Sequence, residues 1–241
     1  MTTLCDCHIH IVGSTARYPM LEARPYTPGP ATVEQIRSLG APLGIKRFVV
    51  VQPSFYGADN DMLCDALEEF GGAGRGVAVA DPARATEVGK VALAKAGVCG
   101  WRINLYSTPG EAPGQTLAAR FADIGALASR YGWHVQVIAP LPMLIEAASL
   151  LEASPVPVVI DHYGLPAGRG PVSGAGQQLL ALMQRPHTPP HKAQPGDAAP
   201  LPYRPIDYGR LVAAFRAALP DMASAQRIMG SNAARLYGFA A

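Results

Sequence analysis

The sequence predicts an α/β protein built around a parallel sheet, and three observations support that prediction. Short apolar, β-branched runs alternate with amphipathic stretches of helical length from residue 4 to residue 160. The runs are almost continuously apolar, as in strands that are covered on both faces. Polar side chains collect where the runs end, at the carboxyl edge where parallel α/β folds place their sites.

Strands are expected at Leu4–Val12, Arg47–Gln52, Gly76–Ala80, Val98–Leu105, Trp133–Ile138 and Val156–Ile160. Helices are expected at Thr32–Leu43, Asp59–Phe70, Arg84–Ala96, Gln115–Tyr131, Leu141–Ala153, Ser173–Gln184, Asp207–Leu219 and Met222–Leu236. Thr32 and Asp59 are predicted N-caps, because their side-chain oxygens can accept from the first turn. Gly44, Gly97 and Gly132 are predicted to follow helices as C′ glycines.

Composition narrows the class of protein. The 241 residues are 49% hydrophobic and 16% charged, which indicates one globular domain. A net charge of +2 with scattered Lys and Arg argues against nucleic acid as a partner. We expect no membrane span, because no apolar run reaches the roughly 18 residues required. The start of the chain does not resemble a signal peptide, and four cysteines without disulfide or zinc spacing suit a cytoplasmic protein.

Two histidines open the chain as a candidate site. His8 and His10 are one residue apart in the first apolar run, and alternation along a strand would send both to one face. There they could share a divalent metal or a substrate group. The alternative is two packing histidines without a joint role. On the same alternation, Cys5 and Cys7 are expected to face away from the histidines as small packing residues.

Further polar residues follow the other expected strands. They are Gln52, Ser54, Tyr56, Arg102, Asn104, His134, Gln136, Asp161 and His162. Their clustering at strand ends predicts a binding site at one edge of the sheet. Strand parity predicts that Asp161 points away from His162. For Arg102 an ion pair with a nearby acid is the alternative to substrate binding, and for His134 it is simple packing.

These residues also form motifs with a familiar order. The motifs are Asp6–His10, Val51–Asn60, Gly74–Ala78, Gly100–Asn104, Gly132–Gln136, Asp161–Gly164 and Ser231–Tyr237. Together they resemble the amidohydrolase-2 group of the amidohydrolase superfamily. That resemblance implies a (β/α)8 TIM-barrel fold and, for many members, hydrolysis of lactones derived from sugar acids and aromatic compounds.

The resemblance also implies roles for single residues. His8, His10 and His162 would surround the reacting carbonyl as catalytic groups. In metal-using members the same three would hold one divalent metal such as zinc, whereas other members work without metal. Arg102 would bind a substrate carboxylate through its planar fork. The remaining substrate-binding residues implied are Asn104, Ser54, Tyr56, His134 and His187.

The chain departs from the family pattern near its end. Members carry a Trp-x-x-Asp-Trp-Pro-His motif at the end of strand eight, and its Asp activates the attacking water. Here only Pro186-His187 matches, so strand seven, most of strand eight and that Asp are predicted to be absent. Residues 186–206 are expected to form an irregular Pro-rich loop within a single barrel domain spanning 1–241.

We therefore expect a hydrolase that opens the ring of a small carboxylate-bearing or sugar-acid lactone by attack of water. Leu165 and Ser107–Gly110 stand where the family's dicarboxylate lactonase has arginines, which favours a less anionic substrate. The alternatives are a lactone isomerase, a metal-dependent decarboxylase, and a non-catalytic remnant without the Asp. The expected partner is a small-molecule acid or lactone, and assembly into a homo-oligomer stays open.

Overall fold

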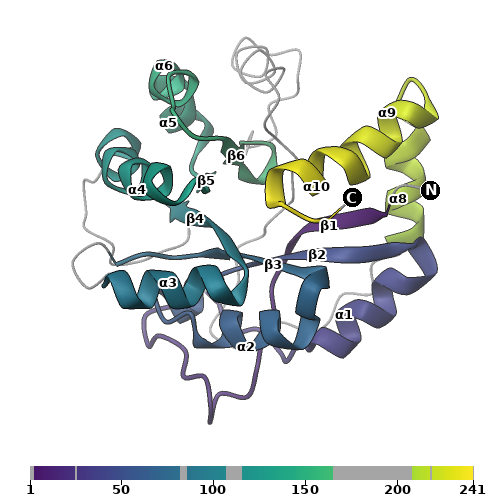
Figure 1. Ribbon diagram of the computed structural model, residues 1–241, viewed down its shortest axis with the longest axis horizontal. Coiled ribbons are helices and arrows are strands. Elements are labelled where there is room, and N and C mark those ends of the chain that lie inside the picture. Colours follow the sequence, from purple (N-terminus) through teal and green to yellow (C-terminus); the bar gives the residue numbers. More distant parts are fainter. Residues whose placement is uncertain are drawn as a thin grey trace.

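A computed structural model describes residues 3–24, 26–81, 86–106, 116–164, 208–217 and 219–240. Within them, six parallel strands form one sheet in sequential order. The strands are β1 (Leu4–Ile9), β2 (Ile45–Val51), β3 (Gly74–Ala78), β4 (Val98–Asn104), β5 (His134–Ile138) and β6 (Val158–Ile160). The six described strands curl like part of a barrel wall, with helices packed on its outer side (Figure 1). The predicted α/β fold of the barrel type is confirmed, whereas the predicted loss of strand seven and most of strand eight concerns residues outside the described ranges.

Helices connect the strands and end the chain. The α-helices are α1 (Val33–Gly40), α2 (Asp61–Phe70), α3 (Glu87–Ala96), α4 (Leu117–Tyr131), α5 (Leu141–Glu146), α6 (Ala148–Glu152), α8 (Tyr208–Ala217), α9 (Met222–Gln226) and α10 (Asn232–Tyr237). Short turns are η1 (Ala41–Leu43), η2 (Ser54–Tyr56), η3 (Gly71–Ala73), η4 (Asp161–Gly164) and the π-helical η5 (Arg227–Ser231). No helix among the described residues is long and apolar enough to cross a bilayer.

The helix ends confirm the predicted N-cap at Thr32 and the predicted glycines after three helices. Thr32 caps α1 in a reciprocal capping box with Gln35, as the sequence predicts. Gly44, Gly97 and Gly132 all adopt the left-handed backbone that favours glycine after a helix.

Three helix predictions need correction. The N-cap of α2 is Asn60 rather than Asp59, although the Asp59 carboxylate still accepts from the Asp61 amide. The stretch 141–153 is two short helices that meet at Ala147. The stretch 222–236 is interrupted by η5, a π-turn that brings the tail against β1. The expected helix 173–184 and the Pro-rich segment 186–206 lie outside the described residues.

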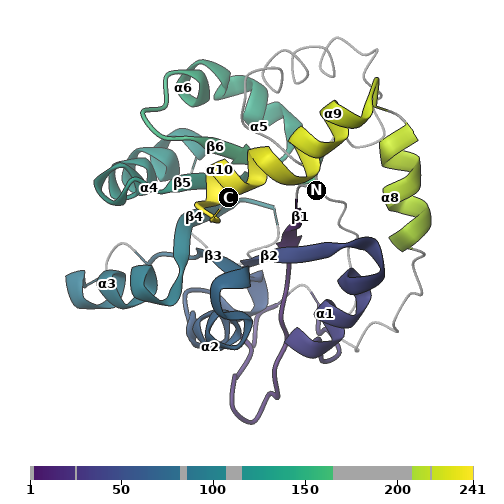
Figure 2. The ribbon, with the colours of Figure 1, turned by 45° about the vertical axis from the view of Figure 1, so that its right-hand side comes forward.

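Two apolar layers hold the sheet. The outer layer packs β-strand side chains such as Phe48 and Val50 against the helices. The inner layer is smaller, and α10 fills it: Tyr237 packs there against inward-facing side chains of β2 and β3. Figure 2 shows α10 lying across the concave side of the curled sheet. The polar site lies beyond this inner layer, toward the carboxyl ends of the strands.

Candidate active site

The predicted histidines meet at the carboxyl end of the sheet. The ring centroids of His8 and His10 are 5.0 Å apart, and those of His8 and His162 are 5.2 Å apart. His162 comes from η4, directly after β6, where its φ of +53° is the only positive value for a non-glycine residue in the described chain. Residues from β1 and from the end of β6 therefore share one site.

A register shift in β1 explains how its histidines reach the interior. Between Asp6 and Ile9 the pairing of β1 with β2 slips, as in a β-bulge. Cys5 and Cys7 pack against the inner layer, whereas Ile9 belongs to the outer layer. The prediction that the two cysteines face away from the histidines is thus wrong, because the bulge breaks the simple alternation on which it relied.

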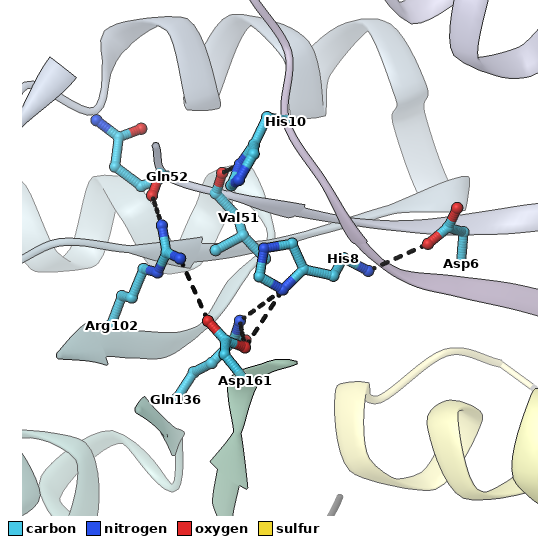
Figure 3. A network of polar contacts seen from close by, with 8 residues as sticks. All are labelled: Asp6, His8, His10, Val51, Gln52, Arg102, Gln136 and Asp161. Atoms are coloured by element: carbon cyan, nitrogen blue, oxygen red, sulfur yellow. Dashed lines mark hydrogen bonds and ion pairs between the residues drawn. The ribbon is translucent and has the colours of Figure 1, made fainter. Parts of the chain in front are cut away.

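Asp161 is the residue at which the polar contacts converge, and the sequence prediction about it is wrong. Its Oδ1 lies 3.3 Å from His8 Nδ1 and accepts from Gln136 Nε2 at 2.7 Å. Its Oδ2 accepts from Arg102 Nη2 at 3.2 Å (Figure 3). Parity along β6 does not apply to Asp161, because the strand ends at Ile160 and a 3₁₀ turn begins.

The neighbours of Asp161 favour its charged form. Burial opposes ionisation of Asp161, but the interactions with His8, Arg102 and His162 outweigh it and hold the pKa of this carboxyl well below its usual range. The ion pair considered for Arg102 is therefore present. Its Nη1 donates to the Gln52 carbonyl at 2.7 Å, which fixes the guanidinium between two strands.

The local contact of His10 defines its tautomer. Its Nδ1 lies 2.7 Å from the Val51 carbonyl oxygen, and a carbonyl only accepts, so Nδ1 carries the proton. Burial, reinforced by His8 and Arg102, lowers the pKa of His10 well below its ordinary value. The imidazole is therefore neutral at pH 7, and its Nε2 carries a lone pair for a metal or a proton.

The other predicted site residues lie around this centre. Asn104 is buried at the end of β4, where its side chain accepts from the Tyr106 amide at 3.0 Å. Ser54 and Tyr56 are buried in η2, and the Tyr56 hydroxyl accepts from the Gly13 amide. His134, on β5, faces the concave side of the sheet and is only 2% exposed. His187 lies outside the described residues.

Several buried polar atoms of the site have no hydrogen-bond partner within the described part of the chain. They are Arg102 Nε, Gln52 Oε1 and Gln136 Oε1. Such atoms are costly to bury unless something satisfies them. Both donor and acceptor capacity is thus left for a polar ligand beside the histidines.

One group of side chains could hold a metal ion. His8, Asp161 and His162 each offer one ligand atom, and these atoms lie within 4.8 Å of one another. Two imidazoles and a carboxylate form a donor set that zinc accepts. Asp161 was not predicted as a ligand, and His10, which was, is not in this group. The signal for Asp161 was its position beside His162 directly after an apolar run.

Comparison with known proteins identifies the family of the chain. Residues 5–187 match the amidohydrolase family. The chain belongs to the amidohydrolase family. A solved structure from Acinetobacter baumannii, described as a probable 2-pyrone-4,6-dicarboxylic acid hydrolase with citric acid bound, has a TM-score of 0.78 and 21% identity over 98% of this chain and 100% of that chain. An amidohydrolase from Burkholderia multivorans with bound zinc has a TM-score of 0.65 and 17% identity, over 98% and 99%.

Two relatives with assigned reactions share sequence with the chain. The 2-pyrone-4,6-dicarboxylate hydrolase of Comamonas testosteroni is 34% identical over 67% of this chain and 52% of its own length. The 4-sulfomuconolactone hydrolase of Hydrogenophaga intermedia is 30% identical over 76% of this chain and 59% of its own length. The chain thus spans between half and three fifths of the length of these relatives.

Proposed function

We propose that this protein is a lactone hydrolase that opens the ring of a small lactone carrying a carboxylate or derived from a sugar acid. The observation that supports this best is the cluster of His8, Asp161 and His162 beside Arg102, at the carboxyl ends of parallel strands. Family membership and relatives that act on lactones support the same reaction class. The finer reaction and the substrate are part of the proposal.

Each group has a proposed task. His8 and His162 face the reacting carbonyl, and Asp161 holds His8 and Arg102 in place. His10 accepts the proton of the attacking water at Nε2, since its other nitrogen is committed to Val51. The ring C–O bond then breaks, and that proton passes to the leaving oxygen.

A metal fits this arrangement without being required by it. His8, Asp161 and His162 would hold the ion, which when bound supplies a Lewis acid for the carbonyl and for water. Without an ion, His8 and Asp161 form an ion pair, and the His162 ring lies beside the His8 ring. A metal-free mode, in which the histidines act by hydrogen bonding alone, remains part of the proposal.

The substrate is proposed to carry one carboxylate. Arg102 is a cation buried within the cluster, and its Nε–H has no hydrogen-bond partner among the described residues. Leu165 and Ser107–Gly110, positions at which the family resemblance implies arginines in a dicarboxylate lactonase, are not cationic. A carboxylate next to Arg102 would satisfy the open Nε–H, whereas a second carboxylate would find less compensation.

The test is turnover of a lactone series by the purified chain, with zinc added and with metal chelated. The series contains 2-pyrone-4,6-dicarboxylate, 4-sulfomuconolactone, a monocarboxylate lactone and a neutral sugar lactone. We expect a product heavier by one water, formed fastest from the monocarboxylate lactone. Arg102→Met should raise KM for that substrate about 10–100-fold more than KM for the neutral lactone, as expected for loss of a hydrogen bond to a charged group.

Lys95→Met, which removes an exposed cation on α3, is the matched control and should change neither constant. A product of unchanged mass would instead indicate an isomerase, and release of carbon dioxide a decarboxylase. Ligand binding without turnover would identify a non-catalytic protein. Each of these three outcomes contradicts the proposal.

A further inference from the structure

The inner layer beneath the site contains the ring of Tyr237, the more deeply buried of its two aromatic rings. Tyr237 of α10 is 2% exposed and packs among small side chains, including Val49, Val51 and Val77. Cys5, Cys7 and Cys99 pack against the same layer, on β1 and β4. The strands thus leave a space on their concave side that side chains of the tail fill, with the Tyr237 ring among them.

Two arginines from neighbouring strands hold the segment that carries the ring. Arg75 of β3 donates from Nε to the Tyr237 carbonyl at 3.1 Å and from Nη2 to the Gly238 carbonyl at 2.8 Å. Its guanidinium lies 4.6 Å from the centre of the Phe239 ring. Arg47 of β2 donates to the Ala240 carbonyl and also lies over Phe239. The last residues are therefore tied to the sheet through main-chain oxygens.

The buried ring of Tyr237 stands against His134. The two ring centroids are 5.2 Å apart with the planes 83° from parallel, an edge-to-face contact. On its other side His134 lies against Gly100 of β4, where an added Cβ would come within 2.2 Å of the imidazole. His134 is thus held between the backbone of β4 and the ring supplied by the tail.

The same row of β5 reaches the site. Gln136 is two residues beyond His134 and so points to the same face of the strand. Its Nε2 lies 2.7 Å from Asp161 Oδ1 and 3.2 Å from His8 Nδ1. A displacement of the inward-facing side chains at His134 would therefore shift the contacts of Gln136 with His8 and Asp161.

We propose that Tyr237 is a positioning residue, which holds His134 against Gly100 and thereby keeps Gln136 in register with His8 and Asp161. This inference rests on the proposed lactone hydrolysis for its kinetic consequence only. On this proposal the C-terminal tail contributes to the geometry of the site as well as to the packing of the sheet. His134 then positions its neighbours and does not itself contact the substrate.

The test compares Tyr237→Leu with Phe239→Leu in the full-length protein. Both changes remove a buried ring of the inner layer, but Tyr237 is the ring in edge-to-face contact with His134. We expect Tyr237→Leu to lower kcat at least about tenfold with KM little changed, since small misplacements of reacting groups are costly. Phe239→Leu should keep kcat within about twofold at a similar loss in Tm. Tyr237→Phe, which keeps the ring, should retain kcat.

A second readout does not depend on turnover. Imidazole nitrogen resonances of His134 and His8, assigned with His134→Gln and His8→Gln, should move in Tyr237→Leu and stay in place in Phe239→Leu. Unmoved resonances in Tyr237→Leu, or equal kcat losses in both leucine variants, would overturn the inference. If the wild-type chain opens no lactone, the proposed function fails, while the resonances still decide the role of Tyr237.

Discussion

His134 makes stability depend on pH at the scale of a single residue. Burial lowers its pKa from 6.5 to about 4, so the folded protein prefers the neutral imidazole. The unfolded chain takes up a proton near pH 6.5, whereas the folded chain resists until about pH 4. The contribution of neutral His134 to the free energy of unfolding is therefore complete above pH 6.5 and is lost as the pH falls from 6.5 to 4. At 1.36 kcal/mol per unit of pKa, the loss is about 3 kcal/mol.

Urea unfolding at several pH values checks this expectation. The free energy of unfolding of wild type should fall more steeply between pH 6.5 and 4 than that of His134→Gln, with the difference approaching about 3 kcal/mol. His10, whose pKa is also lowered, remains in both proteins and so cancels. Parallel pH profiles would show that His134 is not held neutral by the fold.

Asp161 shows where residue-level prediction succeeds and where it stops. Residue types at strand ends were enough to bring His8, His10 and His162 into one prediction, because parallel strands end at a common edge. The orientation of Asp161 was not predictable, since alternation holds only while a strand continues and β6 ends one residue earlier. The orientation of Cys5 and Cys7 was not predictable for a similar reason, because the register of β1 is set by its pairing with β2 and shifts at the bulge.

At the scale of elements, the long segment after β1 is fastened to α2. Asp65 accepts from Arg17 Nη2 and from the Tyr18 hydroxyl, each at 2.5 Å. Asp65→Asn should release this segment without unfolding the domain, because the Arg17 pair is exposed and only the Tyr18 bond contributes about 1 kcal/mol. Trypsin should then cut after Arg17 about fivefold faster, as 1 kcal/mol of opening implies. Glu68→Gln, an exposed carboxylate on the same helix, should leave the cleavage rate unchanged, and equal rates in both variants would contradict the anchoring.

Element boundaries were harder to predict than the elements themselves. All six apolar runs became strands, because burial on both faces leaves a strong signal in the sequence. The start of α2 was displaced because the Asn60 side chain bonds the Val79 backbone across the fold, which no local pattern reveals. The site depends on similar long-range contacts, so its outline was predictable and its centre was not.

At the scale of the whole molecule, the site joins the two ends of the described sheet. β1 and β6 are the first and last strands in its order, yet His8 and Asp161 meet across the interior at 3.3 Å. Gln136 and Arg102 extend the same network to β5 and β4. The polar network therefore connects strands that lie far apart in the curled sheet. Loss of a network residue should lower the free energy of unfolding of the whole protein.

A double-mutant cycle on Asp161 and Arg102 measures that link. Asp161→Asn should cost about 3–5 kcal/mol, because it leaves the charge of Arg102 buried without its counterion. Arg102→Met keeps most of the aliphatic stem, and adding it to Asp161→Asn should recover part of that loss. The coupling free energy from urea unfolding should exceed about 1 kcal/mol.

The Arg17–Asp65 pair, whose side chains are 71% and 38% exposed, supplies the control cycle and should couple by less than about 1 kcal/mol. Equal coupling in the two cycles would mean that the buried network does not hold the curled sheet together.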